Sequence, residues 1–344
     1  MVRLIPRLEL NIVTGFLGSG KTTLLKRYLQ QQPFGSTLVI INEFGRESID
    51  NHLTMSLTSE IETIANGCLC CTVLTTLQET LLQTLTRRMR GELPALQRII
   101  IETSGLADPT PILGTILTDE NLNEYIKAGP CITAFDALEG CQTLAAFTEA
   151  ATQLAAADRV VVTKSDLADS ASIVGVMAAI RSVNPACQIM LNDVPEAIFA
   201  PLEQNASISS PPSPTDISAH AHTSAVSSFS AVLDKAVDWA TFSVWLTALL
   251  NRHGDRILRF KSVLAVRSAG KLVVQGVRHR VYPPSHLPAG PDEDNISRLV
   301  FITKDMREQE ILESLQRFSA AASTQLSRAS VGKGFTRGFQ KNKV

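Results

Sequence analysis

The sequence carries almost no net charge. Its 344 residues include 32 lysines and arginines against 33 aspartates and glutamates, which gives a formal net charge of −1. A chain so close to neutrality has no overall field that draws it to nucleic acid or to an anionic lipid surface. We therefore expect neither a nucleic acid nor a membrane among its partners.

Long apolar runs are also missing. No segment approaches the roughly 18 uninterrupted apolar residues that indicate a membrane-spanning helix. The apolar stretch at the N-terminus is interrupted by Arg7, Glu9 and Asn11 and runs into a glycine-rich loop without a cleavage site, so we expect no signal peptide. These absences favour a cytoplasmic protein.

A disulfide framework is the third absence. The chain has six cysteines, and Cys68, Cys70 and Cys71 lie within four residues of one another. Cysteines that close rarely pair in a normal bridge. Their spacing is typical of metal ligation or redox chemistry in a reducing compartment. The other cysteines are isolated and are expected to be core residues, namely Cys131, Cys141 and Cys187.

Short runs rich in Ile and Val alternate with helical stretches through about residue 200. The expected strands lack strict alternation, as strands buried on both faces do: Leu8–Thr14, Thr37–Asn42, Arg98–Thr103, Cys131–Asp136, Arg159–Lys164 and Gln188–Leu191. The expected helices are Lys21–Gln31, Leu74–Arg90, Cys141–Ala155 and Ala171–Val183. This order predicts an α/β fold with a mostly parallel sheet flanked by helices.

A change of composition divides the chain. Residues 205–230 are rich in Ser, Pro, Ala and Thr and are expected to be a linker. A small α+β domain is expected over 231–326 and a basic, solvated tail over 327–344, after a nucleotide-binding domain over 1–204. The elements expected in the small domain are helices Trp239–Arg252 and Glu308–Phe318 and strands Ile257–Val266, Leu272–Gly276 and Ser297–Ile302.

A complete phosphate-binding loop, G-x-x-x-x-G-K-[ST], runs from Gly15 to Thr22 between an expected strand and an expected helix. Its glycines let backbone N–H groups point at phosphate oxygens, and the helix adds its positive N-terminal end. Lys21 is expected to reach the β- and γ-phosphates, and Thr22 to offer its hydroxyl to Mg²⁺. The residues expected to bind nucleotide here are Gly15, Gly18, Ser19, Gly20, Lys21, Thr22 and Thr23.

A carboxylate ends the apolar strand Arg98–Thr103. Glu102 is expected beside the phosphate loop at the carboxyl edge of the sheet, where it helps to hold Mg²⁺. Gly105 is expected to give a backbone N–H to the γ-phosphate, which makes 105–109 a segment that senses hydrolysis. Lys21, Thr22 and Glu102 are thus the expected catalytic residues.

The sequence Thr163-Lys164-Ser165-Asp166 predicts the choice of base. Guanine carries N1–H and N2–H₂ donors side by side, and the carboxylate of Asp166 can accept both. The stem of Lys164 is expected to lie along the face of the base. The commoner GTPase motif has Asn at the position of Thr163, although the signal-recognition GTPases also use Thr.

The cysteine cluster supplies soft ligands that suit Zn²⁺ or Co²⁺. Glu43 ends the second expected strand and is a candidate for a further ligand, and His52 is a weaker one. No second Cys/His pair appears, which favours an open, exchangeable site over a permanent structural zinc. A redox switch and plain packing remain alternatives. In the linker, His220 and His222 are either a metal pick-up pair or incidental.

Five motifs in order make the chain resemble the CobW-type metallochaperone GTPases, relatives of the urease and hydrogenase nickel-insertion GTPases. They are Gly15–Thr23, Asn42–Gly45 with Asp50, Asn66–Cys71, Glu102–Pro109 and Thr163–Asp166. The C-terminal part resembles the family's appended domain through Leu258–Lys261 and Leu299–Ile302. Many members have a further Glu where this chain has Arg46, and a longer His-rich stretch before the C-terminal domain.

The resemblance implies a P-loop GTPase with GTP or GDP and Mg²⁺ as cofactors. It implies that Cys68, Cys70, Cys71 and Glu43 bind Zn²⁺ or Co²⁺, and that hydrolysis drives metal transfer to a client protein. A homodimer is an open alternative, and intrinsic hydrolysis is expected to be slow. Two rival hypotheses remain, a small-molecule kinase that prefers ATP and a nucleotide-gated zinc or redox sensor with negligible turnover.

Overall fold

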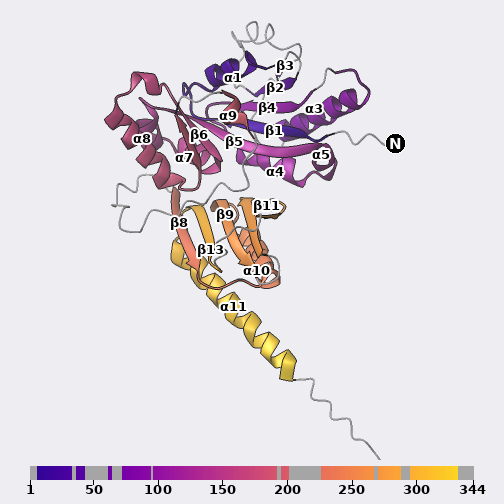
Figure 1. Cartoon of the computed structure of the whole chain (residues 1–344), viewed down its shortest axis with the longest axis vertical. Helices are drawn as coiled ribbons and strands as arrows, with labels where there is room; N and C mark the ends of the chain where they lie inside the picture. The colour runs from indigo at the N-terminus through magenta and orange to yellow at the C-terminus, as the bar shows by residue number, and fades with distance from the viewer. Residues whose placement is uncertain are drawn as a thin grey trace, which may run out of the picture.

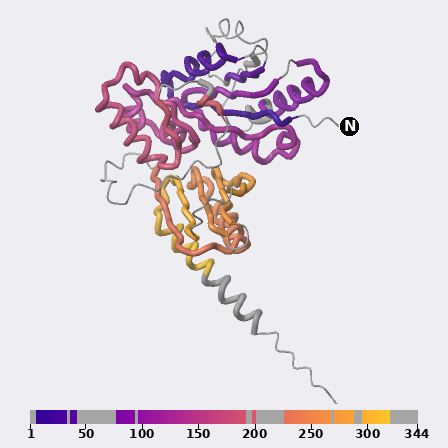
Figure 2. The backbone as a smooth tube through the Cα atoms, viewed as in Figure 1, coloured from indigo at the N-terminus to yellow at the C-terminus, as the bar shows by residue number. Residues whose placement is uncertain are grey.

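The computed structural model describes residues 6–32, 36–42, 61–63, 72–93, 96–191, 195–200, 226–266, 270–287 and 295–331. Its described part consists of two units, an α/β domain with a parallel sheet and a smaller antiparallel domain that lies against it (Figure 1). In Figure 2 the described residues up to α9 (Pro195–Phe199) lie in the first unit, and those from β8 (Val226–Leu233) onward lie in the second.

The first unit is a seven-stranded sheet in the order β3-β2-β4-β1-β5-β6-β7. All its pairings are parallel. The strands are β1 (Leu8–Thr14), β2 (Thr37–Asn42), β3 (Ile61–Thr63), β4 (Arg98–Thr103), β5 (Ile126–Asp136), β6 (Arg159–Thr163) and β7 (Gln188–Leu191). In a parallel sheet the carboxyl ends of all strands meet at one edge, which gathers residues that are distant in the sequence.

Helices cover both faces of this sheet. They are α1 (Lys21–Leu29), α3 (Thr72–Met89), α4 (Thr110–Thr118), α5 (Glu120–Tyr125), α6 (Gly140–Ala146), α7 (Thr148–Ala156), α8 (Ser170–Val183) and α9 (Pro195–Phe199). Within β4, Ile99 and Ile101 pack with α3 and α4, whereas Ile100 packs with α1 and α9. The unbroken apolar runs therefore reflect burial on both faces, and the α/β prediction is confirmed.

Several elements of this domain differ from the sequence-based expectation, which included none of β3, α4, α5 and α9. Helix Cys141–Ala155 is divided into α6 and α7 at Phe147, whose backbone is extended at φ −128° and ψ 124°. The ring of Phe147 lies 4.7 Å from that of Phe16 in the phosphate loop, a contact that periodicity does not reveal. Strand β5 begins five residues earlier than expected, because Gly129 and Pro130 suggest a turn but lie within the strand.

The second unit is a six-stranded sheet in the order β11-β10-β9-β13-β8, with β12 paired to β10. Its pairings are antiparallel. The strands are β8, β9 (Ile257–Val266), β10 (Gly270–Val277), β11 (Arg280–Val281), β12 (Ser285–His286) and β13 (Ser297–Lys304). Helices α10 (Trp239–His253) and α11 (Glu308–Val331) pack on it around Phe242, Trp245, Phe260 and Phe301. The expected small α+β domain is thus present.

The boundaries of that domain differ from the expectation at both ends. Strand β8 begins at Val226, so residues 226–230 belong to the sheet and not to the linker. Its Ser- and Ala-rich sequence hides an edge strand, because backbone pairing with β13 fixes it more than its side chains do. Helix α11 continues to Val331, four residues beyond the expected start of the tail at 327.

A buried ion cluster joins the two units. Arg259 of β9 pairs with Asp158, the residue before β6, and donates to the carbonyl of Ala156 at 2.7 Å. Lys261 lies 3.0 Å from the same carboxylate, whose other oxygen accepts the N–H of Cys131 at 3.0 Å. Arg259 is 2% exposed. The motif Leu258–Lys261 therefore holds the second unit against the first.

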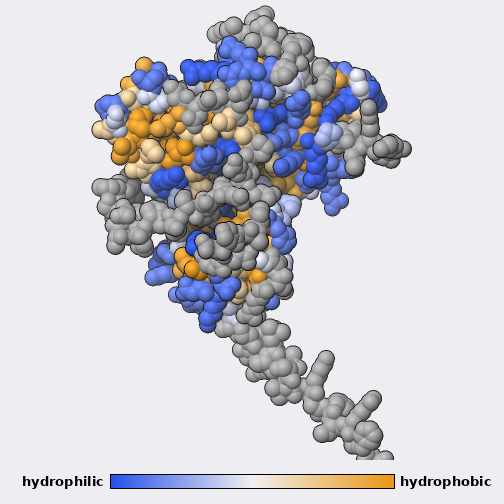
Figure 3. Space-filling model, in the orientation of Figure 1, coloured by the Kyte–Doolittle hydropathy of each residue, from blue (hydrophilic) through white to orange (hydrophobic). Residues whose placement is uncertain are grey.

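Figure 3 shows hydrophilic residues interspersed with apolar patches on one face of both units. Exposed apolar side chains on α8 include Val174 and Met177. None of the helices in the described part of the chain is long and apolar enough to cross a membrane.

Candidate nucleotide-binding site

The phosphate loop connects β1 to α1 through three glycines with positive φ angles. Gly15, Gly18 and Gly20 have φ of 136°, 72° and 87°. A Cβ atom on Gly15 would lie 2.4 Å from the carbonyl oxygen of Ala134, so a side chain there has no room. No side chain in the described residues caps α1, whose Ncap is Gly20. The first N–H groups of the helix therefore face the space inside the loop, as an anion site requires.

Lys21 lies across the mouth of this loop. Its Nζ donates to the carbonyl oxygens of Gly15 at 2.9 Å and Phe16 at 3.0 Å, and the residue is 9% exposed. The ammonium is thus held on the concave side of the loop at the N-terminus of α1. A fixed cation beside a helix N-terminus is suited to phosphate oxygens.

Glu102 lies where the sequence predicts it, beside the phosphate loop. The hydroxyl of Thr22 donates to its Oε1 at 2.6 Å, and Glu102 is 1% exposed. Strand pairing brings it there, because Val13 of β1 is the partner of Glu102 in β4. The hydroxyl of Thr103 also bonds to that of Thr14, at 2.8 Å. A buried carboxylate and a hydroxyl at this spacing provide the hard oxygen ligands that Mg²⁺ takes.

The segment after β4 touches both the loop and the second unit. A Cβ atom on Gly105 would lie 2.7 Å from the backbone N of Leu17, so the two backbones are in close contact. From α7, the Gln153 amide donates to the carbonyl oxygens of Gly105 and Ala107, both at 3.0 Å. Periodicity assigns Gln153 only to a helix, so its role was not predicted.

Arg278 provides the contact from the second unit. It has a φ of 50° after β10, and its Nη2 donates to Asp108 Oδ2 at 2.6 Å while its Nε donates to Thr110 Oγ1 at 2.8 Å. The other oxygen of Asp108 accepts from the N–H of Thr110 at 2.9 Å. A separation of 170 residues leaves no local sequence signal for this pair.

The base-recognition motif lies at the carboxyl end of β6. The hydroxyl of Thr163 donates to the carbonyl of Ser19 at 2.7 Å, so Thr ties the motif to the phosphate loop. Lys164 has a φ of 54°, and its Nζ pairs with Asp136 at 2.6 Å. Asp136 ends β5 opposite Thr163 and is 7% exposed. Sequence reasoning missed Asp136, although its place at a strand end was a usable signal.

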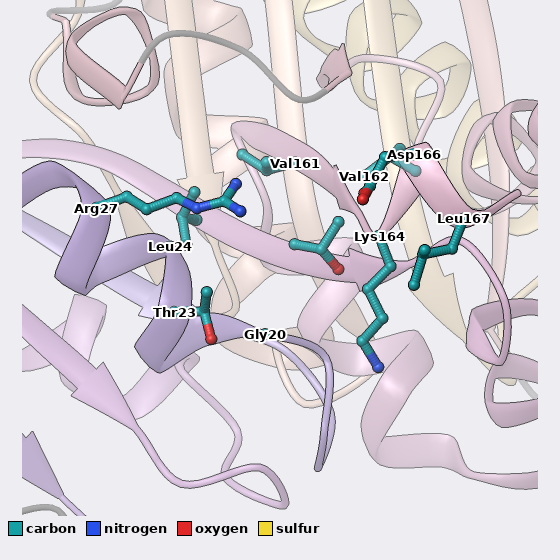
Figure 4. Close-up of a pocket in the computed structure, with 10 residues that line it drawn as sticks. Gly20, Thr23, Leu24, Arg27, Val161, Val162, Lys164, Asp166 and Leu167 are labelled. Atoms are coloured by element: carbon teal, nitrogen blue, oxygen red, sulfur yellow. The ribbon is translucent and has the colours of Figure 1, made fainter.

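A pocket of about 200 Å³ lies between α1 and this motif. Its lining comes from α1, β6 and the short 3₁₀ turn Ser165–Leu167, and Figure 4 shows it. Asp166 and Thr23, both expected from the sequence to contact a nucleotide, line this pocket. Arg27 lines it too and was not predicted. The full lining is Gly20, Thr23, Leu24, Arg27, Val161, Val162, Thr163, Lys164, Asp166 and Leu167.

The predicted metal ligands Cys68, Cys70, Cys71 and Glu43 lie outside the described residues, as do His52, His220 and His222. Within the described residues, no three His, Cys, Asp or Glu side chains are grouped so as to hold a metal ion.

Cys131 and Cys187 are buried, as expected of core residues. Burial raises the pKa of the Cys131 thiol to about 12 and that of Cys187 to about 11, so both stay protonated at neutral pH. The prediction for Cys141 is wrong, because this residue lies exposed in the first turn of α6.

Comparisons with known proteins agree with this geometry. The sequence profile "CobW/HypB/UreG, nucleotide-binding domain" matches residues 9–191, and "Cobalamin synthesis protein cobW C-terminal domain" matches 226–319. The zinc chaperone YjiA of Escherichia coli is 32% identical over 311 residues, which cover 88% of this chain and 96% of that protein. The zinc chaperone CobW of Pseudomonas aeruginosa is 30% identical over 358 residues, which cover 92% of each.

Among solved structures, the crystal structure of Zn(II)-bound YjiA GTPase from E. coli has a TM-score of 0.69 at 25% identity. The similarity covers 91% of this chain and 99% of that one. Both units of the present chain therefore have counterparts in one solved protein.

Proposed function

Because the chain belongs to the CobW/HypB/UreG family, we propose that it is a GTP-hydrolysing metallochaperone that carries Zn²⁺ or Co²⁺ to a client protein. The metal is cargo in this proposal and binds Cys68, Cys70, Cys71 and Glu43. That its relatives include zinc chaperones supports Zn²⁺ over Co²⁺ as the cargo of this protein. So does the general affinity order of divalent metals for such ligands.

The observation that carries the proposal is the convergence of three motifs on one edge of the sheet. Lys21 and Thr22 of the phosphate loop lie beside Glu102, and Thr163 bonds directly to the loop through the Ser19 carbonyl. Asp166 lines the adjoining pocket. One bound molecule can meet all of them only if it has a base at one end and phosphates at the other.

Thr22 and Glu102 would hold a magnesium ion, and when bound this ion offsets the negative charge of the phosphates. The protein's own residues bind and orient the nucleotide. Lys21 and the N–H groups of the loop bind and orient the phosphates, while Asp166 and Lys164 position the base. Intrinsic hydrolysis is expected to be slow, because none of the assigned residues is an arginine finger or a water-positioning Gln.

We expect nucleotide binding and metal binding to be coupled because of where the metal motif lies in the sequence. Glu43 and the cysteines lie between Thr22 and Glu102, where P-loop proteins keep the segments that reorder with the γ-phosphate. If the two nucleotide states bind the metal with different affinity, linkage requires that the metal change nucleotide affinity by the same factor. The Arg278–Asp108 pair would extend this coupling to the second unit, because Asp108 lies in the segment expected to sense hydrolysis.

Measurement of GTP turnover tests the enzymatic part. We expect slow multiple-turnover release of phosphate from GTP with Mg²⁺, little release from ATP, and a rate that changes when Zn²⁺ is added. Preference for ATP would favour the kinase hypothesis. Turnover that stays negligible with Zn²⁺ would favour a nucleotide-gated sensor.

Exchange of Asp166 for asparagine is expected to invert the choice of base. An amide cannot accept both the N1–H and N2–H₂ donors of guanine, but its NH₂ group can donate to the O2 atom of xanthine. We expect GDP affinity to fall about 100-fold, a loss within the roughly 1–3 kcal/mol of a bidentate base contact. Affinity for xanthosine diphosphate should rise.

Asp169→Asn is the matched control for this exchange. Asp169 is an exposed Ncap whose carboxylate accepts from Ser172 N at 2.7 Å, and asparagine caps helices equally well. Its GDP affinity should equal that of the wild type. Unchanged GDP affinity in Asp166→Asn would remove Asp166 from base recognition.

A further inference from the structure

Helix α1 forms one wall of the nucleotide pocket with residues at helical spacing. Gly20, Thr23, Leu24 and Arg27 line it at i, i+3, i+4 and i+7, so they share one face of the helix. Three of these are small or apolar, whereas Arg27 ends in a planar cation. Arg27 is therefore the charged group that this wall contributes.

The place of Arg27 along the helix separates it from the phosphates. Phosphates are expected at the N-terminal end of α1, which begins at Lys21. Arg27 lies six residues further on, or about 9 Å along the axis at about 1.5 Å per residue. In Figure 4 its side chain extends from α1 toward the side of the pocket where Asp166 lies. Its guanidinium is thus at the base end of the pocket and not at the phosphate end.

Nothing in the described residues commits Arg27 to another role. The side chain is exposed, and no described residue forms a hydrogen bond or ion pair with it. Leu24, Val161 and Leu167 around it give the pocket an apolar lining, in which a directed hydrogen bond gains strength. The guanidinium of Arg27 is therefore available to donate to acceptor atoms of a ligand in the pocket.

Guanine has those acceptors on the edge next to the one that Asp166 is expected to read. Its O6 and N7 accept side by side, and a guanidinium is the side chain that best matches this pair. Adenine carries an N6–H₂ donor in place of O6, which a guanidinium repels. The Asp166 carboxylate therefore matches the donor edge of guanine, and the Arg27 guanidinium matches its acceptor edge.

We propose that Arg27 is a specificity-determining residue that donates from its guanidinium to the O6 and N7 atoms of the bound guanine. The proposal rests on the proposed GTP-binding function and deepens it. Base choice is then divided between two elements, the 3₁₀ turn Ser165–Leu167 with Asp166 and helix α1 with Arg27. A contact of Arg27 with the α-phosphate is the competing assignment, and its consequences differ.

The test uses the full chain and equilibrium binding of four diphosphates: GDP, 7-deaza-GDP, which lacks the N7 acceptor, IDP, which lacks the N2 amine, and ADP. We expect wild-type protein to bind GDP about tenfold more tightly than 7-deaza-GDP. In Arg27→Met this ratio should fall toward one, while the GDP-to-IDP ratio, which reports Asp166, should stay unchanged. Arg252→Met, at an exposed arginine in the last turn of α10, is the matched control.

Each outcome decides between the assignments. Equal weakening of all four diphosphates in Arg27→Met would assign Arg27 to a phosphate and overturn the proposal. An unchanged GDP-to-7-deaza-GDP ratio would overturn it as well. Wild-type protein that binds ADP as well as GDP would contradict the proposed GTP function itself. Thermal unfolding should be the same in both arginine variants, since Arg27 has no partner in the described residues.

Discussion

Asp158→Ala is expected to lower the free energy of unfolding by about 3–5 kcal/mol, the cost of removing one partner from a buried ion pair. The variant leaves the guanidinium of Arg259, which is 2% exposed, without its carboxylate. It also removes the partner of Lys261 and the acceptor for the N–H of Cys131. Urea unfolding followed by circular dichroism and by Trp fluorescence measures the change.

Two further variants check this explanation. Asp234→Ala removes an exposed carboxylate and should change stability by less than about 0.5 kcal/mol. Asp158→Ala combined with Arg259→Met should cost less than the sum of the two single changes, because no unpaired guanidinium remains. Additive losses would mean that the two side chains do not interact as the structure indicates.

The same carboxylate gives a pH dependence with a definite sign. Burial raises the pKa of Asp158, but the charges of Arg259 and Lys261 outweigh burial and hold the pKa below its usual range. A depressed folded pKa stabilises the protein above the unfolded pKa, and this stability is lost as pH falls through the folded pKa. The difference in the free energy of unfolding between wild type and Asp158→Ala should therefore be constant from about pH 5 to 7 and shrink below about pH 4.

Lys21→Ala is expected to lower kcat/KM for GTP by about 10²–10³-fold, as loss of one preorganised electrostatic contact typically does. Lys21 is held at the loop by the Gly15 and Phe16 carbonyls, so its cation is in place before phosphate arrives. The variant loses both this charge and the contact that shapes the loop. The rate of phosphate release at subsaturating GTP gives kcat/KM.

Lys235→Ala, at an exposed lysine between β8 and α10, is the control and should keep the wild-type value. Thermal unfolding separates a folding defect from a catalytic one. A Lys21→Ala variant that is folded but inactive keeps a cooperative unfolding transition. Wild-type turnover in Lys21→Ala would show that the loop does not bind the reacting phosphates.

The fold was largely predictable because its strands carry local signals. The runs of Leu, Ile and Val in β1, β2, β4 and β6 are buried on both faces, so their composition alone marks them. β8 escaped recognition, because an edge strand needs few apolar residues and its Ser-rich sequence resembles the linker before it. The break at Phe147 was hidden as well, since its ring contacts Phe16, a residue distant in the sequence.

The residues of the site also differ in whether a local sequence signal marks them. Lys21, Thr22 and Asp166 belong to motifs whose spacing is local, and Glu102 is reached from them by the rule that parallel strands end at one edge. Gln153, Arg278 and Arg27 were not foreseen, because each joins the site through packing between distant elements or by its position on a helix face. The metal ligands Cys68, Cys70, Cys71 and Glu43 lie outside the described residues and stay a prediction from the sequence motif.

We propose that one nucleotide state of the protein binds the metal more tightly than the other. Chelator competition for Zn²⁺ tests it most directly, with Mg²⁺ and a non-hydrolysable GTP analogue in one titration and Mg²⁺ and GDP in the other. We expect affinities that differ tenfold or more, about 1.4 kcal/mol of coupling, and loss of tight binding when Cys68, Cys70 and Cys71 are replaced by serine. Tight binding of equal strength in the two states would contradict it.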